Sequence, residues 1–145
     1  MINFQQVTQF QALLAARQDL QLLAVAKNVD AQQLRCLYEH TGWKDYAESR
    51  LDALVAKKNQ LRDLPLIWHY IGPLQSRKIK QIVLHCDQIQ TVCRTKEMTL
   101  IEQAASQVEK VISIWIQIDY SKVAGRSGCD EDTALGLVEL ALASE

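Results

Sequence analysis

The chain has 145 residues, of which 48% are hydrophobic and 23% are charged, and its formal net charge is -1. This length suits one domain with a sizeable core, and this composition argues against disorder. The small net charge gives no field that would favour nucleic acid or an anionic membrane, and no apolar run reaches the ~18–20 residues of a membrane helix. Residues 1–6 lack the basic and apolar regions of a signal peptide, so we expect a cytoplasmic protein.

Hydrophobic spacing predicts helices that alternate with short apolar strands. The expected helices cover residues 4–18, a segment capped by Asp30 that carries Leu34, Leu37 and Tyr38, and residues 46–62, 76–85, 96–109 and 131–143. The expected strands cover residues 22–26, 66–71, 88–92 and 111–118. Such alternation implies parallel pairing through right-handed crossovers, so the fold class is α/β. The pattern leaves open a doubly wound sheet and a barrel, and because no linker divides residues 1–145, we expect a single domain.

Lys27 follows the first expected strand directly. The carboxyl end of a parallel strand faces the edge where α/β folds keep their sites, and desolvation there would make a lysine amine nucleophilic toward an aldehyde. The alternative is a solvated lysine at a strand end. Lys57 and Lys58, within an expected helix, are expected to be surface lysines.

A second candidate site is the segment 68–76, where a strand ends in a Gly-Pro pair before a polar helix start. This turn would bring His69, Gln75 and Ser76 near the same mouth. For His69 the alternative is an ordinary histidine within a strand.

Two further patterns carry weaker signals. The four cysteines match no zinc-site spacing, so we expect reduced thiols and no metal, although His85, Cys86 and Cys93 could be imagined as three ligands. Residues 125–128, Gly-Arg-Ser-Gly, follow a strand and could cradle a phosphate, but they do not form a Walker pattern.

Three segments, in this order, resemble the pyridoxal-phosphate homeostasis family, the YggS-like relatives of the alanine racemase N-terminal barrel. Residues 22–27, LLAVAK, are similar to the family's LLAVSK strand, and residues 68–78, WHYIGPLQSRK, nearly match its WHFIGPLQSNK. Residues 115–119 with 126–128 look like its L-I-Q-V-N strand and the K-S-G that follows. The resemblance spans about residues 10–140.

The resemblance implies a (β/α)₈ barrel that binds pyridoxal 5'-phosphate without an assigned catalytic turnover. We therefore expect an intracellular cofactor-homeostasis protein rather than an enzyme. By resemblance, Lys27 carries the cofactor as a Schiff base, and His69, Gly72 and Ser76 lie near its ring.

The departures from the family concern the second strand and the length. Asp45 stands where the family's F-G-E-N-Y segment has its asparagine, in the cofactor site, and a carboxylate there would disfavour a phosphate. Because about three residues are missing before Tyr46, we expect a vestigial second strand. A barrel typically needs ~250 residues, so we expect an incomplete TIM-type (β/α) barrel of about five β/α units. The family's S-M-G-M and R-I-G-T segments, which hold the cofactor phosphate, have no counterpart in residues 1–145.

Two other functions compete with cofactor homeostasis. One is that of a decayed homologue which binds no cofactor and acts only as a structural or interaction protein; the other is that of a racemase, which would need a second domain. No nucleic acid or membrane is expected as a partner. Residues 111–118 carry apolar side chains on both faces and would form an open edge, which predicts a homodimer through that edge or a cover made by residues 131–143.

Overall fold

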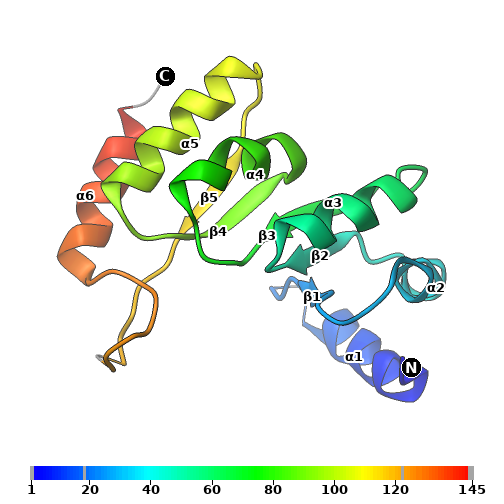
Figure 1. Cartoon of the computed structure of the whole chain (residues 1–145). Helices are drawn as coiled ribbons and strands as arrows, with labels where there is room; N and C mark the ends of the chain where they lie inside the picture. Colours follow the sequence, from blue (N-terminus) through cyan, green and yellow to red (C-terminus); the bar gives the residue numbers. More distant parts are fainter. Residues whose placement is uncertain (1, 18, 122, 144–145) are drawn as a thin grey trace.

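The computed structural model describes residues 2–17, 19–121 and 123–143 and shows a parallel sheet of five strands (Figure 1). The strands are β1 (Ala24–Val25), β2 (Asp45–Glu48), β3 (Ile67–Tyr70), β4 (Gln88–Val92) and β5 (Ser113–Ile116). The helices are α1 (Phe4–Ala16), α2 (Ala31–Thr41), α3 (Leu51–Gln60), the short 3-10 helix η1 (Ser76–Lys78), α4 (Ile79–His85), α5 (Thr95–Gln107) and α6 (Glu131–Leu142). Helices α3 to α6 contact one another in succession along the sheet.

The order of the strands decides between the two α/β architectures. The strands lie side by side in chain order, β1-β2-β3-β4-β5, and every neighbouring pair is parallel. A doubly wound sheet reverses its order at a switch point, whereas a (β/α) barrel adds each strand beside the previous one. The expected α/β class is confirmed, and the sheet is an arc of an incomplete TIM-type barrel.

Alternation of side chains along the strands separates a packed core from an inner face. Trp68 and Tyr70 of β3 are 2% and 3% exposed and pack between the sheet and the helices, beside the fully buried Tyr46 of β2. Asp45 and His69 point to the opposite face, which in a closed barrel lines the interior. The sequence therefore provides one apolar face for the helices and one polar face for the barrel.

The expected helix over residues 46–62 is wrong in its first part. Residues 45–48 form β2, which pairs with β1 on one side and β3 on the other, and α3 begins only at Leu51. The expectation of a vestigial second strand is wrong for the same reason. Pairing on both sides satisfies the backbone of β2, and the burial of Tyr46 outweighs the weak helical preference of this short stretch.

Helix α2 begins as its sequence predicts. The Asp30 carboxylate accepts a hydrogen bond from the Gln33 amide at 2.7 Å, and the Gln33 side chain accepts one from the Asp30 amide at 3.2 Å, which together form a capping box. The helix ends at Gly42, whose φ of 70° is a left-handed conformation that glycine adopts without strain. These two signals set where the chain turns toward β2.

The sheet has β1 and β5 at its edges, and both edges are short. Beyond β5, Ile118 forms a parallel bridge with Cys129, so the segment before α6 covers the end of this edge. Helix α6 then packs against β5 and α5, as expected for a cover made by residues 131–143.

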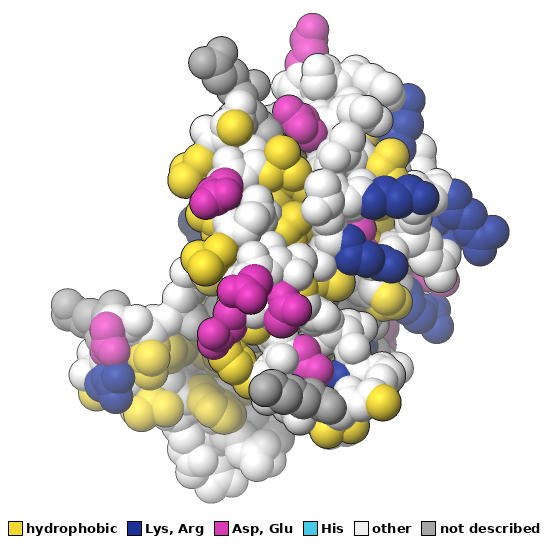
Figure 2. Space-filling model, turned by 90° about the vertical axis from the view of Figure 1, so that its left-hand side faces the viewer, with side chains coloured by type: hydrophobic (Ala, Val, Ile, Leu, Met, Phe, Trp, Pro, Cys, Tyr) yellow, Lys and Arg dark blue, Asp and Glu magenta, His cyan; other side chains and the backbone are white. Residues whose placement is uncertain are grey.

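Apolar side chains nevertheless remain exposed near β5. Val111 is 97% exposed and Trp115 is 57% exposed. Figure 2 shows the side of the molecule that carries α6, where hydrophobic side chains lie at the surface among acidic ones; Leu135 and Leu142 are 64% and 82% exposed. Among the described residues, no helix has the length and apolar character needed to cross a membrane.

Candidate functional site

Lys27 lies at the carboxyl edge of the sheet, the side on which all the parallel strands end. Its predecessor Ala26 is 1% exposed and extends the β1–β2 pairing, because its amide donates to the Ala47 carbonyl at 2.8 Å. Lys27 itself is exposed. The strand therefore delivers a primary amine to solvent at the edge where such folds keep their sites.

A tight turn holds Lys27 in this place. The Val29 amide donates to the Ala26 carbonyl at 3.2 Å, so the turn closes around Lys27 and Asn28. Asn28 has a φ of 62°, in the left-handed region that asparagine tolerates better than most residues. The turn ends at Asp30, which starts α2, so the position of Lys27 depends on a short and well-defined path.

Gly72 and Ser76 lie at the same edge, after β3. A Cβ on Gly72 would come within 2.0 Å of the Ser49 carbonyl oxygen, so only glycine lets the end of β3 approach the end of β2 this closely. Gly72 is buried, and Ser76 is exposed at the start of η1. Lys27, Gly72 and Ser76 therefore all lie at the carboxyl edge of the sheet, Lys27 after β1 and the other two after β3.

His69 lies on the inner face between two polar partners. Its Nε2 is 2.9 Å from Oδ1 of Asp45, and its Nδ1 is 3.0 Å from Nε2 of Gln90. Its side chain is 4% exposed, so both ring nitrogens are partnered in a nearly closed environment. These residues line a cavity of about 300 Å³ with Gln88 and Trp115.

The register of the strands separates this cluster from Lys27. Ala47 pairs with both Val25 and His69, so Asp45 lies toward the amino ends of the strands and Lys27 toward their carboxyl ends. At about 3.3 Å per residue, the levels of Asp45 and Lys27 differ by about 13 Å along the strands. Contact of Asp45 and His69 with a cofactor stays a prediction, and in the structure these two residues contact each other.

The loop 125–128 is shaped by its last glycine. A Cβ on Gly128, whose φ is 133°, would lie 2.7 Å from the Asp119 amide nitrogen. The Ser127 carbonyl accepts a hydrogen bond from the Gln117 side chain at 3.2 Å. The loop is therefore tied to the end of β5, and its use as a phosphate cradle stays a prediction.

The cysteines form no metal-binding cluster among the described residues. Cys86 is fully buried, and burial raises the pKa of its thiol to about 12. Burial likewise raises the pKa of the Cys93 thiol. Buried neutral thiols are poor nucleophiles. The thiols were expected to be mostly buried, and two of them are, Cys86 and Cys129, whereas Cys36 is exposed.

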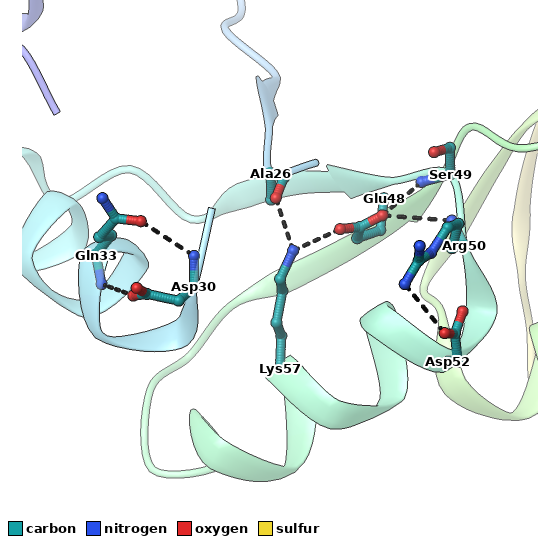
Figure 3. A network of polar contacts seen from close by, with 8 residues as sticks. All are labelled: Ala26, Asp30, Gln33, Glu48, Ser49, Arg50, Asp52 and Lys57. Carbon is teal, nitrogen blue, oxygen red and sulfur yellow. Dashed lines mark hydrogen bonds and ion pairs between the residues drawn. The ribbon is translucent and has the colours of Figure 1, made fainter. Parts of the chain in front are cut away.

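Sequence reasoning missed a buried ion pair behind this edge. Lys57 of α3 was expected at the surface, but it is 9% exposed, and its Nζ lies 2.5 Å from Oε1 of Glu48, which is 2% exposed (Figure 3). The signal was present in the spacing, since Lys57 falls on the same helical stripe as Leu54 and Leu61, which are both buried.

Known proteins resemble this chain over most of its length. The family described as alanine racemase, N-terminal domain, matches residues 4–145. A pyridoxal phosphate homeostasis protein of Pseudomonas aeruginosa is 32% identical over 118 residues, which make up 81% of this chain and 51% of that protein. One of Vibrio alginolyticus is 31% identical over 128 residues, with 85% of this chain and 54% of that protein covered. The chain spans about half the length of these curated relatives.

Solved structures give the same picture. PipY of Synechococcus elongatus PCC7942, without PLP, has a TM-score of 0.84 and 27% identity, covering 92% of this chain and 63% of that one. The same protein with PLP bound has a TM-score of 0.77 and 28% identity over the same shares. An alanine racemase of Clostridium difficile 630, with 14% identity and a TM-score of 0.66, covers 84% of this chain and 32% of its own and shares the fold.

The family match over residues 4–145 agrees with the parallel arc of β/α units and with a lysine in the turn that follows the first strand. The chain belongs to the alanine racemase N-terminal domain family, and its relatives include proteins named pyridoxal phosphate homeostasis proteins.

Proposed function

We propose that the chain binds pyridoxal 5'-phosphate and takes part in intracellular homeostasis of this cofactor, with Lys27 as the residue that holds it. The observation that carries the proposal is the exposed amine of Lys27 at the carboxyl edge, in a fold that matches a PLP-bound structure at a TM-score of 0.77. The proposal covers binding in the cytoplasm without catalytic turnover.

The residues at the edge fit the aldehyde end of the cofactor. A neutral amine at Lys27 would add to the aldehyde carbon, and loss of one water would leave a carbon–nitrogen double bond, the Schiff base. Gly72 and Ser76 lie at the same edge of the sheet and would flank the cofactor there. His69, whose ring nitrogens are both partnered, would shape the inner wall below it.

Chemical reduction tests this proposal directly. The protein is mixed with pyridoxal 5'-phosphate, reduced with borohydride and digested, and the labelled peptides are mapped. We expect the label on Lys27 and its loss in Lys27→Ala, while Lys58→Met, which changes a lysine on α3, keeps it. Labelling spread over other lysines with none at Lys27 would contradict the proposal.

The second candidate function is that of a decayed homologue that persists only through association. The observation in its favour is the apolar surface near β5, including Val111 at 97% exposure. A visible-light absorption spectrum with added cofactor separates the two functions, because only a bound Schiff base gives a new band. A homodimer through the edge at β5 is compatible with either function, and we propose it as the assembled form.

A further inference from the structure

We propose that Lys57 and Glu48 are positioning residues for Lys27. They form a buried ion pair that holds the carboxyl end of β1 and so fixes the position of Lys27 at the carboxyl edge of the sheet. The inference deepens the proposed function and rests on it for the role of Lys27.

Lys57 reaches the first strand from the face of the sheet that the helices cover. It lies in α3, and its Nζ donates to the Ala26 carbonyl at 2.7 Å and to Oε1 of Glu48 at 2.5 Å (Figure 3). The Lys57 and Glu48 side chains are 11% and 3% exposed. A cation in this position contacts the peptide group that joins Ala26 to Lys27.

Glu48 ties this contact to the second strand. Its other carboxylate oxygen, Oε2, accepts hydrogen bonds from the amides of Ser49 and Arg50 at 2.9 and 3.3 Å. These amides stand at the end of β2 and the beginning of α3, where Arg50 itself provides no side-chain cap. One ion pair therefore links the ends of β1 and β2 with the start of α3.

The Ala26 carbonyl is the point on which the placement of Lys27 depends. It accepts from Lys57 and also from the Val29 amide that closes the turn around Lys27. β1 has only two residues and lies at the edge of the sheet, so few backbone hydrogen bonds hold it. A charge-assisted hydrogen bond at this carbonyl is therefore a large part of what fixes the turn.

Stability alone is a weak explanation for a buried ion pair. Removing two charges from water is costly, and apolar residues of similar size often replace such a pair with no loss of stability. What apolar residues cannot supply is a donor for the Ala26 carbonyl. Lys58 provides a matched comparison, because it lies on the same helix and also donates to a carbonyl, that of His85 at 2.8 Å, away from Lys27.

The test compares Lys57→Met/Glu48→Met with Lys58→Met and the unmodified chain. The double variant removes both charges, so it avoids the unpaired buried carboxylate that Lys57→Met alone would leave.

Two quantities are measured: the rate of borohydride-trapped labelling at Lys27 by pyridoxal 5'-phosphate, and the hydrogen exchange of the Val29 amide without cofactor. In the double variant we expect labelling about tenfold slower and exchange about tenfold faster, the factor for losing about 1.4 kcal/mol. Lys58→Met should stay within about twofold of the unmodified chain on both readouts.

The outcomes separate this inference from the proposed function. Unchanged Lys27 labelling and unchanged Val29 exchange in a folded double variant would overturn the inference. Failure of the double variant to fold would also overturn it, because the pair would then serve the fold as a whole. If the unmodified chain shows no label at Lys27, the proposed function fails, and faster Val29 exchange in the double variant would still support the positioning of the turn.

Discussion

The hydroxyl of Tyr46 is a polar atom in the core that lacks a hydrogen-bond partner among the described residues. The ring is fully buried and lies 6.3 Å, between centroids, from the ring of Trp68. An unsatisfied buried hydroxyl costs about 1–3 kcal/mol of desolvation, whereas the ring contributes to packing. The two parts of this side chain therefore act in opposite directions on stability.

Replacing Tyr46 with phenylalanine should keep or raise stability at neutral pH, by up to about 1 kcal/mol. Burial raises the pKa of Tyr46 from 10.0 to about 12. The hydroxyl therefore stays protonated to a higher pH in the folded state than in the unfolded state. The stability that this pKa difference contributes to the folded state is fully present below pH 10.0 and is lost as the pH rises toward about 12. Urea unfolding at neutral pH and within this window checks both parts. A clear loss of stability in Tyr46→Phe at neutral pH would show that the hydroxyl has a partner.

The reactivity of the cysteine thiols should follow their burial. Cys36 is exposed, whereas Cys86 is buried and the pKa of its thiol is raised to about 12. Because the thiolate is the reactive form, a thiol reagent at neutral pH should modify Cys36 first and Cys86 only after unfolding. Mass spectrometry of the peptides, with and without denaturant, measures this order. Early modification of Cys86 would contradict the packing of α4 against the sheet.

At this scale the sequence predicts the position of Lys27 but not the setting of Lys57. The position of Lys27 follows from strand alternation and a family segment, both visible in residues 22–27. The burial of Lys57 depends on Glu48, and the contact between them forms only after α3 has packed behind β1 and β2. An ion pair between two elements leaves only a faint trace in the sequence, here a lysine on an apolar stripe.

The beginning of α2 depends on its capping box, in which Asp30 and Gln33 each satisfy an amide of the other. Asp30→Ala should lower the free energy of unfolding by about 1 kcal/mol, the usual cost of losing such a cap. Asp130→Ala at α6 removes a single cap hydrogen bond, to the Thr133 amide at 2.8 Å, and is a control for a helix farther from the site. Thermal and urea unfolding give the two values.

The cap at Asp30 has a second consequence, because the turn around Lys27 ends there. Asp30→Ala should therefore slow the trapping of pyridoxal 5'-phosphate at Lys27, whereas Asp130→Ala should not. Equal labelling rates in the two variants would show that α2 and the turn are independent.

Helices and strands were predicted well where the local sequence pattern is clear, and poorly where pairing with neighbouring strands determines the structure. Residues 88–92 and 131–142 form β4 and α6 almost as expected, because apolar alternation or a cap marks them. Residues 46–48 were assigned to a helix, since a four-residue strand between two others has too short a pattern to be recognised. β1 covers only residues 24–25 of the expected 22–26, because it lies at the edge of the sheet and pairs with only two residues of β2, Tyr46 and Ala47.

At the scale of the whole molecule, the chain order of the strands was the part that the sequence left open. Alternating helices and strands suit both a doubly wound sheet and a barrel, and the choice depends on which side each new strand joins. The resemblance indicated the barrel, and the order β1-β2-β3-β4-β5 confirms it. How the edge at β5 is used depends on surfaces that lie far apart in the sequence.

We predict that the 145-residue chain forms a dimer through β5. In the structure, the segment near Cys129 covers only the end of this edge, and Ser113 and Trp115 stay exposed. An open edge strand with apolar side chains is a template for a second chain, and a two-fold dimer would pair β5 with its own copy. Light scattering after size exclusion, over a dilution series, measures the mass in solution.

Two lysine variants locate the contact. Ser113→Lys places a charge on the exposed side of β5, and in a two-fold dimer both copies bring it to the interface. Like charges facing across paired strands are unfavourable, so we expect the dissociation constant to rise about tenfold or more, equivalent to about 1.4 kcal/mol. Leu135→Lys, on the exposed side of α6, is the matched control and should leave an edge-paired dimer intact.

If Leu135→Lys dissociates the dimer and Ser113→Lys does not, the helices form the contact. If the unmodified chain stays monomeric with slowly exchanging amides along Ser113–Ile116, the edge is already covered within one chain and the prediction is wrong.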